Sequence, residues 1–470
     1  MSAAAAVLLP QRSVAVSRLP AAGRRLLFLA LVAAYYATFI WTYNTLLEPW
    51  QGFWGFSRTN VTWEYELLNW LMVLLPGLWL PLELRRPSQL LFLLQYLVLF
   101  VPATVVLYNS RLPFLQPDDV LRLLLVMFAS LSLLQLIYFV PLLRLPPVRV
   151  PLRLYWWVFY GLLSLIGAYI AVSLAGNLKF EGIAQIYASR IDAAELVERA
   201  GGSVLVWYLV GWFIGAFLPI AFAAAVARRS ALTAALVLVS YLFLFGVTGT
   251  KTVLLAVVIL WALSRLARLR QAWFSTGFVA ALSMLLLVPT VFDPFDELGE
   301  TLQKWYVVLV HARIFGVPQL ILGQYYAFFE QHPLTWWSHI NGINAFVNYP
   351  YAIDIPYTAG FYYYAIPVGL NSGMWIEDGI GAAGLGGIPI ITVVAAVVLW
   401  LFDSVTARIP ARFVACASAV VAIDFMNVPL TTTLITGGWA LLALMLYLMP
   451  PQAAADRPRR GGRGARVVGT

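Results

Sequence analysis

Apolar runs of about 20 residues recur along the whole chain, and each is long enough to cross a bilayer as a helix. Short polar segments, many of them containing arginine, separate these runs. The pattern predicts an all-α integral membrane protein with about 12 transmembrane helices. The predicted spans are residues 22–47, 64–84, 89–108, 121–143, 154–174, 203–226, 231–248, 252–264, 273–292, 379–402, 412–430 and 433–449.

The charged residues divide between the two sides of this predicted bundle. An even number of spans places both termini on one side, and the segments on that side carry most of the arginines. The positive-inside rule makes that side cytoplasmic. Nearly all acidic residues fall on the opposite side, so the net charge of +9 reflects membrane orientation and argues against nucleic-acid binding. The arginines concerned are Arg12, Arg18, Arg24, Arg25, Arg85, Arg86, Arg144, Arg149, Arg153, Arg228, Arg229, Arg265, Arg268, Arg270, Arg408, Arg412 and those of the tail RPRRGGRGAR.

The composition excludes a water-soluble globule. Only 11% of residues are charged and the mean hydropathy is +0.83, whereas soluble domains carry about a quarter charged residues. Cys416 is the single cysteine, which excludes disulfides and thiolate metal sites. We expect one polytopic domain over residues 1–450, followed by a disordered basic cytoplasmic tail at 451–470.

Two predicted external loops, residues 175–202 and 293–378, are too long to be simple connections. The second loop is rich in Trp, Tyr and Phe, which argues against disorder and predicts a large folded extracytoplasmic cap. Aromatic side chains such as Tyr325 and Trp336 fit sugar binding, because their rings offer apolar faces with polar edges. Anchoring at the membrane interface uses the same residue types and is the alternative.

Three cationic residues on the predicted outer side suit a diphosphate. Arg190 lies in the first long loop, Lys251 in the tight turn GVTGTKTVLL, and Arg313 in the second long loop. A guanidinium binds two oxygens at once, and a lysine supplies a fixed point charge. The alternatives are a lysine that reaches to the membrane interface and an ion pair between Arg313 and a nearby loop carboxylate.

All three histidines of the chain, His311, His332 and His339, also fall in the second loop. They lack the spacing of a helical zinc pair, and no HExxH motif accompanies them. A histidine there can deprotonate a sugar hydroxyl because its pKa lies near neutrality. Packing within the aromatic loop is the alternative.

The segment NSGMWIEDGIGAAGLGG brings Asn371, Glu377 and Asp378 to the outer end of the tenth predicted span. A carboxylate at this position can act as a general base or orient a hydroxyl. It can equally cap the N-terminus of the helix that follows.

In this order and on this side of the membrane, the motifs resemble those of the O-antigen and polysaccharide polymerases, the Wzy-like family. Arg190 to Gly201 is similar to the family's R-x10-G pattern, and Arg313 to Gly323 is similar but one residue shorter. TGTKT resembles a TGSRT-like turn, with Lys251 in place of arginine. NSGMWIEDGIGAAGLGG resembles the family's N-x-N…(A/E)DG…G-x-x-G segment, so the resemblance covers roughly residues 175–400.

The resemblance implies a glycosyltransferase C-like (GT-C) fold, related to the O-antigen ligases. It implies an enzyme that polymerises undecaprenyl-diphosphate-linked oligosaccharide repeat units at the outer face of a bacterial cytoplasmic (inner) membrane. The product is O-antigen, capsule or exopolysaccharide, and a chain-length regulator protein is a possible partner. A ligase that transfers a finished glycan is the alternative. A transporter or flippase is disfavoured, because Asp424 is almost the only charge within a span and no internal repeat is visible.

The expected transfer inverts the anomeric centre without a metal or cofactor, because fixed cations take the metal's place. We expect Arg190, Lys251 and Arg313 to bind the donor diphosphate. The candidates for the general base, in order of preference, are Asp378, Glu377, His339 and His332. The expected substrate-binding residues are Tyr325, Trp336 and Asn371.

Overall fold

The computed structural model describes residues 20–50, 54–59, 61–111, 115–174, 176, 178, 204–249, 251–266, 271–293, 295–366, 368–370 and 373–454. These residues are predominantly helical, and the β-pairing among them is one isolated bridge between Phe56 and Ser110. The prediction of an all-α protein is therefore confirmed for this part of the chain. The helices are α1 (Ala21–Thr42), α2 (Trp63–Leu74), α3 (Ser88–Leu94), α4 (Val101–Val106), α5 (Pro117–Gln135), α6 (Leu152–Leu174), α8 (Val204–Trp212), α9 (Leu218–Arg228), α10 (Ala231–Thr248), α11 (Lys251–Leu266), α12 (Phe274–Leu287), α13 (Glu297–Tyr306), α14 (Val317–Phe329), α15 (Ile355–Tyr364), α16 (Ala382–Thr406), α17 (Ala411–Ala417), α18 (Ala419–Asn427), α19 (Leu430–Ile435) and α20 (Trp439–Leu448).

Several of these helices join end to end through π-helical or 3-10 turns. Within the described ranges, ten helices are long and apolar enough to cross a membrane, which indicates a multi-pass membrane protein. They are Ala21–Leu47, Ser88–Val106, Pro117–Phe139, Leu152–Leu174, Leu205–Arg228, Ala231–Thr248, Gln271–Val291, Glu297–Phe329, Trp375–Thr406 and Leu430–Leu448. Nine of the ten overlap predicted spans, and Glu297–Phe329 does not.

The three other predicted spans form helices that are shorter than these ten. Residues 64–84 contain α2 and a 3-10 turn, Leu75–Leu78, and the chain leaves the helix around two prolines. Residues 412–430 are divided into α17 and α18, which meet at Ser418. Residues 252–264 lie in α11, which is 16 residues long.

The first part of the predicted loop 293–378 is a 33-residue helix formed by α13, a π-helical segment η10 (Val307–Gly316) and α14. Two of these segments, η10 and α14, contact the same end of the bundle. The π-helical segment contacts η1 (Tyr43–Leu47), which continues α1, and both this segment and α14 contact α4. Because both segments pack near the C-terminal ends of neighbouring helices, this helix lies against one end of the bundle.

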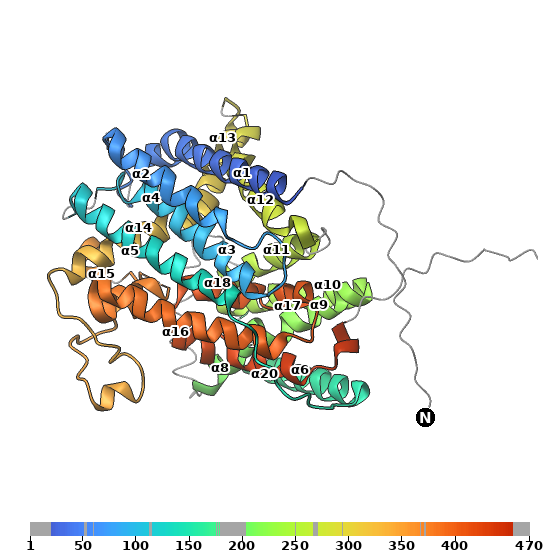
Figure 1. Cartoon of the computed structure of the whole chain (residues 1–470). Coiled ribbons are helices and arrows are strands. Elements are labelled where there is room, and N and C mark those ends of the chain that lie inside the picture. The colour runs from blue at the N-terminus through green and yellow to red at the C-terminus, as the bar shows by residue number, and fades with distance from the viewer. Residues whose placement is uncertain are drawn as a thin grey trace, which may run out of the picture.

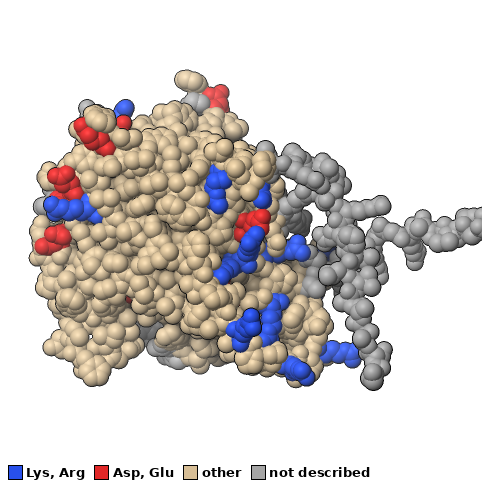
Figure 2. Space-filling model, in the orientation of Figure 1, with Lys and Arg blue, Asp and Glu red and all other residues tan. Residues whose placement is uncertain are grey.

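The other end of the bundle is basic. There Arg24 of α1 pairs with Glu83, and Arg408, beyond the C-terminus of α16, donates to the carbonyl of Leu145. Figure 2 shows Lys and Arg side chains gathered on this side of the molecule, at the right of the view, and most visible acidic side chains elsewhere. In Figure 1, α15 and the segment before it lie at the left, away from the N-terminus of α1. We call the right-hand side the basic end and the left-hand side the cap end.

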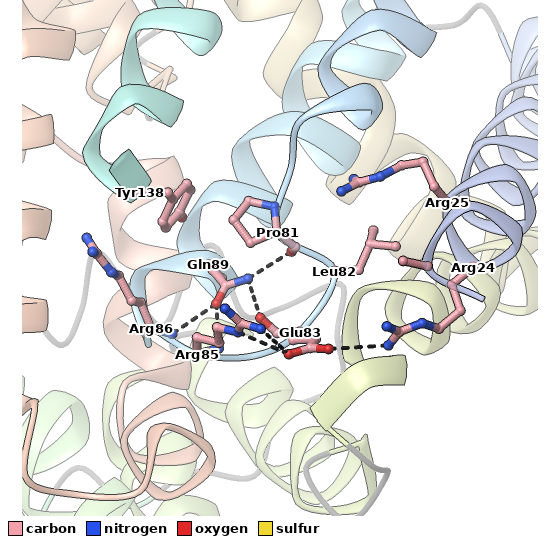
Figure 3. Close-up of a pocket in the computed structure, with 10 residues that line it drawn as sticks. Arg24, Arg25, Pro81, Leu82, Glu83, Arg85, Arg86, Gln89 and Tyr138 are labelled. Carbon is pink, nitrogen blue, oxygen red and sulfur yellow. Dashed lines mark hydrogen bonds and ion pairs between the residues drawn. The ribbon is translucent and has the colours of Figure 1, made fainter. Parts of the chain in front are cut away.

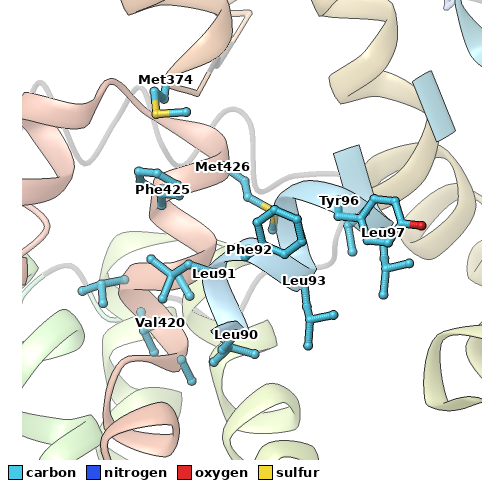
Figure 4. Close-up of a cluster of buried hydrophobic side chains, with 14 of the residues drawn as sticks. Leu90, Leu91, Phe92, Leu93, Tyr96, Leu97, Met374, Val420, Phe425 and Met426 are labelled. Atoms are coloured by element: carbon cyan, nitrogen blue, oxygen red, sulfur yellow. The ribbon is translucent and has the colours of Figure 1, made fainter. Parts of the chain in front are cut away.

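The core between the two ends consists of close apolar packing. In Figure 4, side chains of α3 and of the π-helical segment η4 (Gln95–Phe100) that follows it face Phe425 and Met426 of α18, with Met374 above them. Leu91, Phe92, Phe425 and Met374 are buried. Helix association inside a bilayer depends on such packing because lipid is as apolar as the side chains. This core holds the segment around Met374 in place, and that segment leads into the candidate site.

Candidate active site

The segment before α16 folds back upon it. Nε1 of Trp375 donates to Oγ1 of Thr392 at 2.9 Å, although 17 positions separate these residues. A straight helix would hold them about 25 Å apart. The reversal occurs at Ala383 and Gly384, whose backbone is not helical; Gly384 has φ 60° and ψ −149°, a conformation open to glycine. The π-helical segment η12 (Trp375–Gly381) therefore runs antiparallel to the start of α16.

A glycine makes this hairpin possible. A Cβ added at Gly387 would lie 2.0 Å from the carbonyl oxygen of Gly379, so the two backbones touch directly. The predicted span 379–402 thus begins with a reversal, and the straight helix starts after Gly384. Asp378 lies on the inserted limb of the hairpin and is fully buried.

A second interrupted helix supplies a partner for Asp378. The chain is extended at Val428 between α18 and α19, and Leu430 is the first residue of α19. The backbone N–H of Leu430 donates to Oδ2 of Asp378. Because the first N–H groups of a helix lack partners within it, a carboxylate is stabilised there. Asp378 therefore does cap a helix, although that helix is α19 and not its own.

The other oxygen of Asp378 contacts a histidine. Nε2 of His339 lies 3.0 Å from Oδ1 of Asp378, and the side chains are 15% and 1% exposed, respectively. With the carboxylate ionised, Nε2 carries the hydrogen and donates it, which leaves Nδ1 as the acceptor nitrogen of neutral His339. Both carboxylate oxygens of Asp378 accept hydrogen bonds, whereas the His339 side chain is partly exposed. The carboxylate orients the ring.

Charge near His339 favours its protonated form. Burial lowers the pKa of His339, but the hydrogen bond from the ring to Asp378 and the negative charges of Asp378 and Glu377 outweigh burial. The net result is a pKa raised above the ordinary value. Three of the four predicted base candidates therefore lie together. An imidazole oriented by a carboxylate is suited to taking a proton from a hydroxyl.

The turn that carries His339 is anchored to the helix reversal. The backbone N–H groups of Thr335 and Trp336 donate to the carbonyls of Gly381 and Ala382, each at 2.9 Å. The reversal frees these carbonyls, and pairing them is required where backbone lies inside a membrane protein. Trp336 and Trp337 have φ of 48° and 59°, a left-handed conformation that is unfavourable for non-glycine residues. The anchored turn thus holds a strained backbone that brings His339 to Asp378.

The fourth base candidate, His332, belongs to an aromatic cluster. Its ring stacks on Phe328 with centroids 3.9 Å apart, and its Nδ1 lies 2.8 Å from the Phe328 carbonyl. Tyr362 lies beside this stacked pair and meets both rings edge-on, with centroids 5.2 Å from His332 and 5.4 Å from Phe328. These contacts favour the packing alternative for His332. His311 likewise packs within the bundle, where its Nε2 lies 3.0 Å from the carbonyl of Leu286.

Arg313 lies in η10, on the helix that ends at Phe329. Its guanidinium carbon lies 4.8 Å from the ring centroid of Trp54, a cation–π contact with the segment after α1. Trp54 meets Tyr364 edge-on at 5.9 Å, and the Tyr364 hydroxyl accepts a hydrogen bond from Gln324 of α14. Arg313 is therefore linked through Trp54 and Tyr364 to α14 and α15.

The remaining predicted residues have different outcomes. Arg190 and Asn371 lie outside the described residues. Lys251 is the first residue of α11, and Gly249, with φ 60°, ends α10 just before it, which confirms the predicted tight turn. Trp336 is 54% exposed on the anchored turn. Tyr325 is fully buried with its hydroxyl 3.4 Å from the Leu370 carbonyl, which argues against the predicted substrate contact.

Sequence reasoning missed the contribution of Leu430, Thr335 and Trp54. Pro429 was the available signal for Leu430, because a helix ordinarily ends before a proline and a new helix begins readily just after one. In the described part of the chain, no group of three or more His, Cys, Asp or Glu residues is arranged to hold a metal ion.

Comparison with known protein families, with curated proteins and with solved structures finds no match to this chain. A functional assignment therefore depends on the residues and their geometry.

Proposed function

We propose that this protein is a GT-C-like membrane glycosyltransferase that joins polyprenyl-diphosphate-linked oligosaccharide repeat units into a cell-surface polysaccharide. The observation that carries the proposal is the His339–Asp378 pair, in which a buried carboxylate orients a partly exposed imidazole. The order of the sequence motifs that resemble polysaccharide polymerases supports the same function.

The pair lies at the cap end, near the start of α16, whereas Arg408 follows the other end of that helix at the basic end. The positive-inside rule makes the basic end cytoplasmic, so the proposed chemistry occurs at the outer face. Lipid-linked repeat units that have crossed the bacterial cytoplasmic membrane present their sugars on this side.

In the proposed reaction, Nδ1 of His339 takes the proton of an acceptor sugar hydroxyl. The hydroxyl oxygen attacks the anomeric carbon of the donor, the bond from this carbon to the diphosphate oxygen breaks, and the electron pair leaves with the diphosphate. The anomeric centre is inverted. Asp378 stabilises the imidazolium that forms, as a carboxylate does in a hydrolase triad.

This scheme changes the order of the base candidates. The sequence favours Asp378 as the base, but both of its carboxylate oxygens accept hydrogen bonds, one from His339 and one from the Leu430 N–H. His339 is the group with access to a substrate, and Glu377 adds negative charge beside it. We assign the donor diphosphate to Arg190, Lys251 and Arg313, since fixed cations stabilise the charge that develops on a leaving diphosphate.

A lipid-linked oligosaccharide transporter is the second candidate, and one observation favours it. Transporters place substrate sites between interrupted helices, and here the η12–α16 reversal meets the α18–α19 interruption at Asp378. A ligase that transfers a finished glycan to another acceptor would use the same His339–Asp378 pair.

The test is a reconstituted assay. Purified protein in proteoliposomes receives the native undecaprenyl-diphosphate-linked repeat unit, and products are resolved on a gel. We expect a ladder of repeats from the wild type and none from His339→Gln. Gln331→Ala is the matched control, because Gln331 is an exposed residue of the same segment.

The other outcomes identify the alternatives. Transfer to an added acceptor lipid without a ladder would indicate a ligase. Movement of the intact lipid-linked unit across the bilayer without any new glycosidic bond would indicate a transporter. A ladder that persists in His339→Gln would refute the proposed role of the histidine.

A further inference from the structure

A cavity of about 390 Å³ opens at the basic end, between the start of α1 and the segment that connects α2 to α3. Four arginines and one carboxylate line it, a formal charge of +3 among these groups, together with Gln89 and Tyr138 (Figure 3). The five charged residues are Arg24, Arg25, Glu83, Arg85 and Arg86. The proposed active site is at the other end of the molecule and does not use them.

Two of the arginines are fixed by backbone carbonyls. Arg25 donates to the carbonyls of Gly77 and Leu80 at 2.8 and 2.5 Å, and Arg86 donates to those of Ile137 and Val140 at 2.7 and 2.8 Å. A carbonyl orients a guanidinium without cancelling its charge. Arg25 and Arg86 are therefore held in place and keep their full positive charge, which is available to attract an anion.

The other two arginines share one carboxylate. Arg85 and Arg24 contact the two oxygens of Glu83 at 2.7 and 3.3 Å. The hydrogen bond from Arg85, followed by that from Arg24 and by both charges, lowers the pKa of Glu83 despite its burial, so the carboxylate is ionised. Asp403 accepts hydrogen bonds from Ser88 and also interacts with the charge of Arg86. Even with Asp403 counted, positive charge exceeds negative charge by two.

A buried glutamine fixes the shape of the connecting segment. Oε1 of Gln89 accepts from the backbone N–H groups of Arg85 and Arg86, at 2.7 and 2.9 Å. Its Nε2 donates to the carbonyls of Pro81 and Glu83, at 2.8 and 2.7 Å. Gln89 is fully buried, so the cavity is preformed and needs no rearrangement to present its arginines.

Exposed apolar side chains flank the same cavity. Leu78 and Trp79 precede the connecting segment and are 49% and 38% exposed; Leu136 and Phe139, beside Tyr138, are 54% and 71% exposed. A dissolved phosphate would make no use of these side chains. An amphiphile would place its charged head among the arginines and its hydrocarbon along the apolar surface.

We propose that this cavity binds the phosphate headgroup of an anionic membrane lipid, with the acyl chains lying along the apolar surface beside it. The recognised chemistry is a phosphate anion, which a lipid or a dissolved phosphate can supply. The flanking apolar surface favours a lipid over a dissolved phosphate, because only a lipid has hydrocarbon chains that can contact it. The surplus positive charge provides the attraction, and the preformed guanidinium groups provide paired donors for phosphate oxygens.

The test is native mass spectrometry of the detergent-purified full chain, titrated separately with phosphatidylglycerol, phosphatidylcholine and inorganic phosphate. We expect retained phosphatidylglycerol and no comparable retention of phosphatidylcholine. The double variant Arg24→Gln/Arg85→Gln should bind phosphatidylglycerol about tenfold more weakly or worse. The control, Arg144→Gln/Arg149→Gln, removes two exposed charges from the same end outside the cavity and should bind as the wild type does.

A third variant keeps the test decisive if the double variant does not fold. Glu83→Gln removes the carboxylate that competes with a phosphate, so it should bind phosphatidylglycerol more tightly than the wild type. Equal losses in the double variant and its control would overturn the proposal, because the cavity would then have no special role. Binding of inorganic phosphate that reproduces the variant pattern, with no preference for phosphatidylglycerol, would overturn the lipid assignment.

Discussion

Nε2 of His339 lies 3.0 Å from Oδ1 of Asp378, although 39 positions separate the two residues in the chain. A helix reversal buries the carboxylate, and a turn anchored on that reversal supplies the imidazole. The second carboxylate oxygen accepts from the N–H of Leu430. This arrangement assigns different roles to the two side chains, and each role has its own consequence.

Asp378→Asn is expected to lower the rate of polymer formation by about 10²–10⁴-fold, the usual contribution of an oriented general base. The amide keeps the size of the carboxylate but cannot stabilise an imidazolium, and it favours the wrong ring tautomer. Initial rates in proteoliposomes measure the effect. Asp354→Asn, which changes an exposed carboxylate of the same external segment, is the control. An Asp378→Asn rate within a factor of two of the wild-type rate would contradict the role.

The same substitution should also move the pH dependence. A general base must be neutral, so the wild-type rate rises with pH as His339 loses its proton. Burial lowers the pKa of His339, and the contacts with Asp378 and Glu377 raise it to a net value above the ordinary one. Without the Asp378 charge, the rising limb should therefore shift to lower pH. Rates from about pH 5 to 8 test this, and an unshifted limb would show that another group controls the profile.

Gly387→Ala should separate the two limbs of the reversal. The added Cβ would lie 2.0 Å from the Gly379 carbonyl oxygen, and backbone cannot move aside cheaply. We expect a loss of about 1–3 kcal/mol in the free energy of unfolding, together with loss of polymer formation.

Gly386→Ala provides a matched control, because a Cβ at Gly386 would meet no atom within 4 Å. This substitution should be neutral or slightly stabilising. Thermal unfolding in detergent compares the two variants. Equal melting temperatures would mean that the backbones do not touch as described.

Hydrophobic patterning alone was enough to find nine of the ten apolar helices. It missed Glu297–Phe329 because this helix includes Glu297, Glu300 and Lys304, which dilute its apolar pattern, and because it lies against one end of the bundle. Charged residues are compatible with a helix that lies at an end of the bundle. A span count made from hydropathy treats them as signs of a loop.

The sequence also named His339 and Asp378 separately, but it could not pair them. Their contact depends on the reversal at Ala383–Gly384 and on the interruption before Leu430, which are set by packing between helices. Gly384 and Pro429 mark these places in the sequence. Neither residue alone predicts the direction in which the chain turns.

Removing divalent cations should leave polymer formation unchanged. The proposed scheme assigns the developing diphosphate charge to Arg190, Lys251 and Arg313. Rates with and without a chelator in proteoliposomes measure this. Loss of activity that added magnesium restores would refute the scheme, whereas loss that magnesium does not restore would indicate damage by the chelator.

Arg313→Lys tests whether the guanidinium shape matters as well as its charge. Arg313 lies over Trp54 with 4.8 Å between the guanidinium carbon and the ring centroid. A guanidinium is a planar fork that can bind two diphosphate oxygens, which a lysine cannot do. Lysine keeps the charge but loses the fork, so we expect kcat/KM for the lipid-linked repeat unit to fall about tenfold or more. Arg122→Lys, at an exposed arginine paired with Asp119, is the control and should retain wild-type kcat/KM.

Full activity in Arg313→Lys would show that only the charge of Arg313, or its packing against Trp54, is needed. Loss of activity in Arg313→Lys alone, with unchanged thermal stability, would place the guanidinium among the groups that bind the diphosphate.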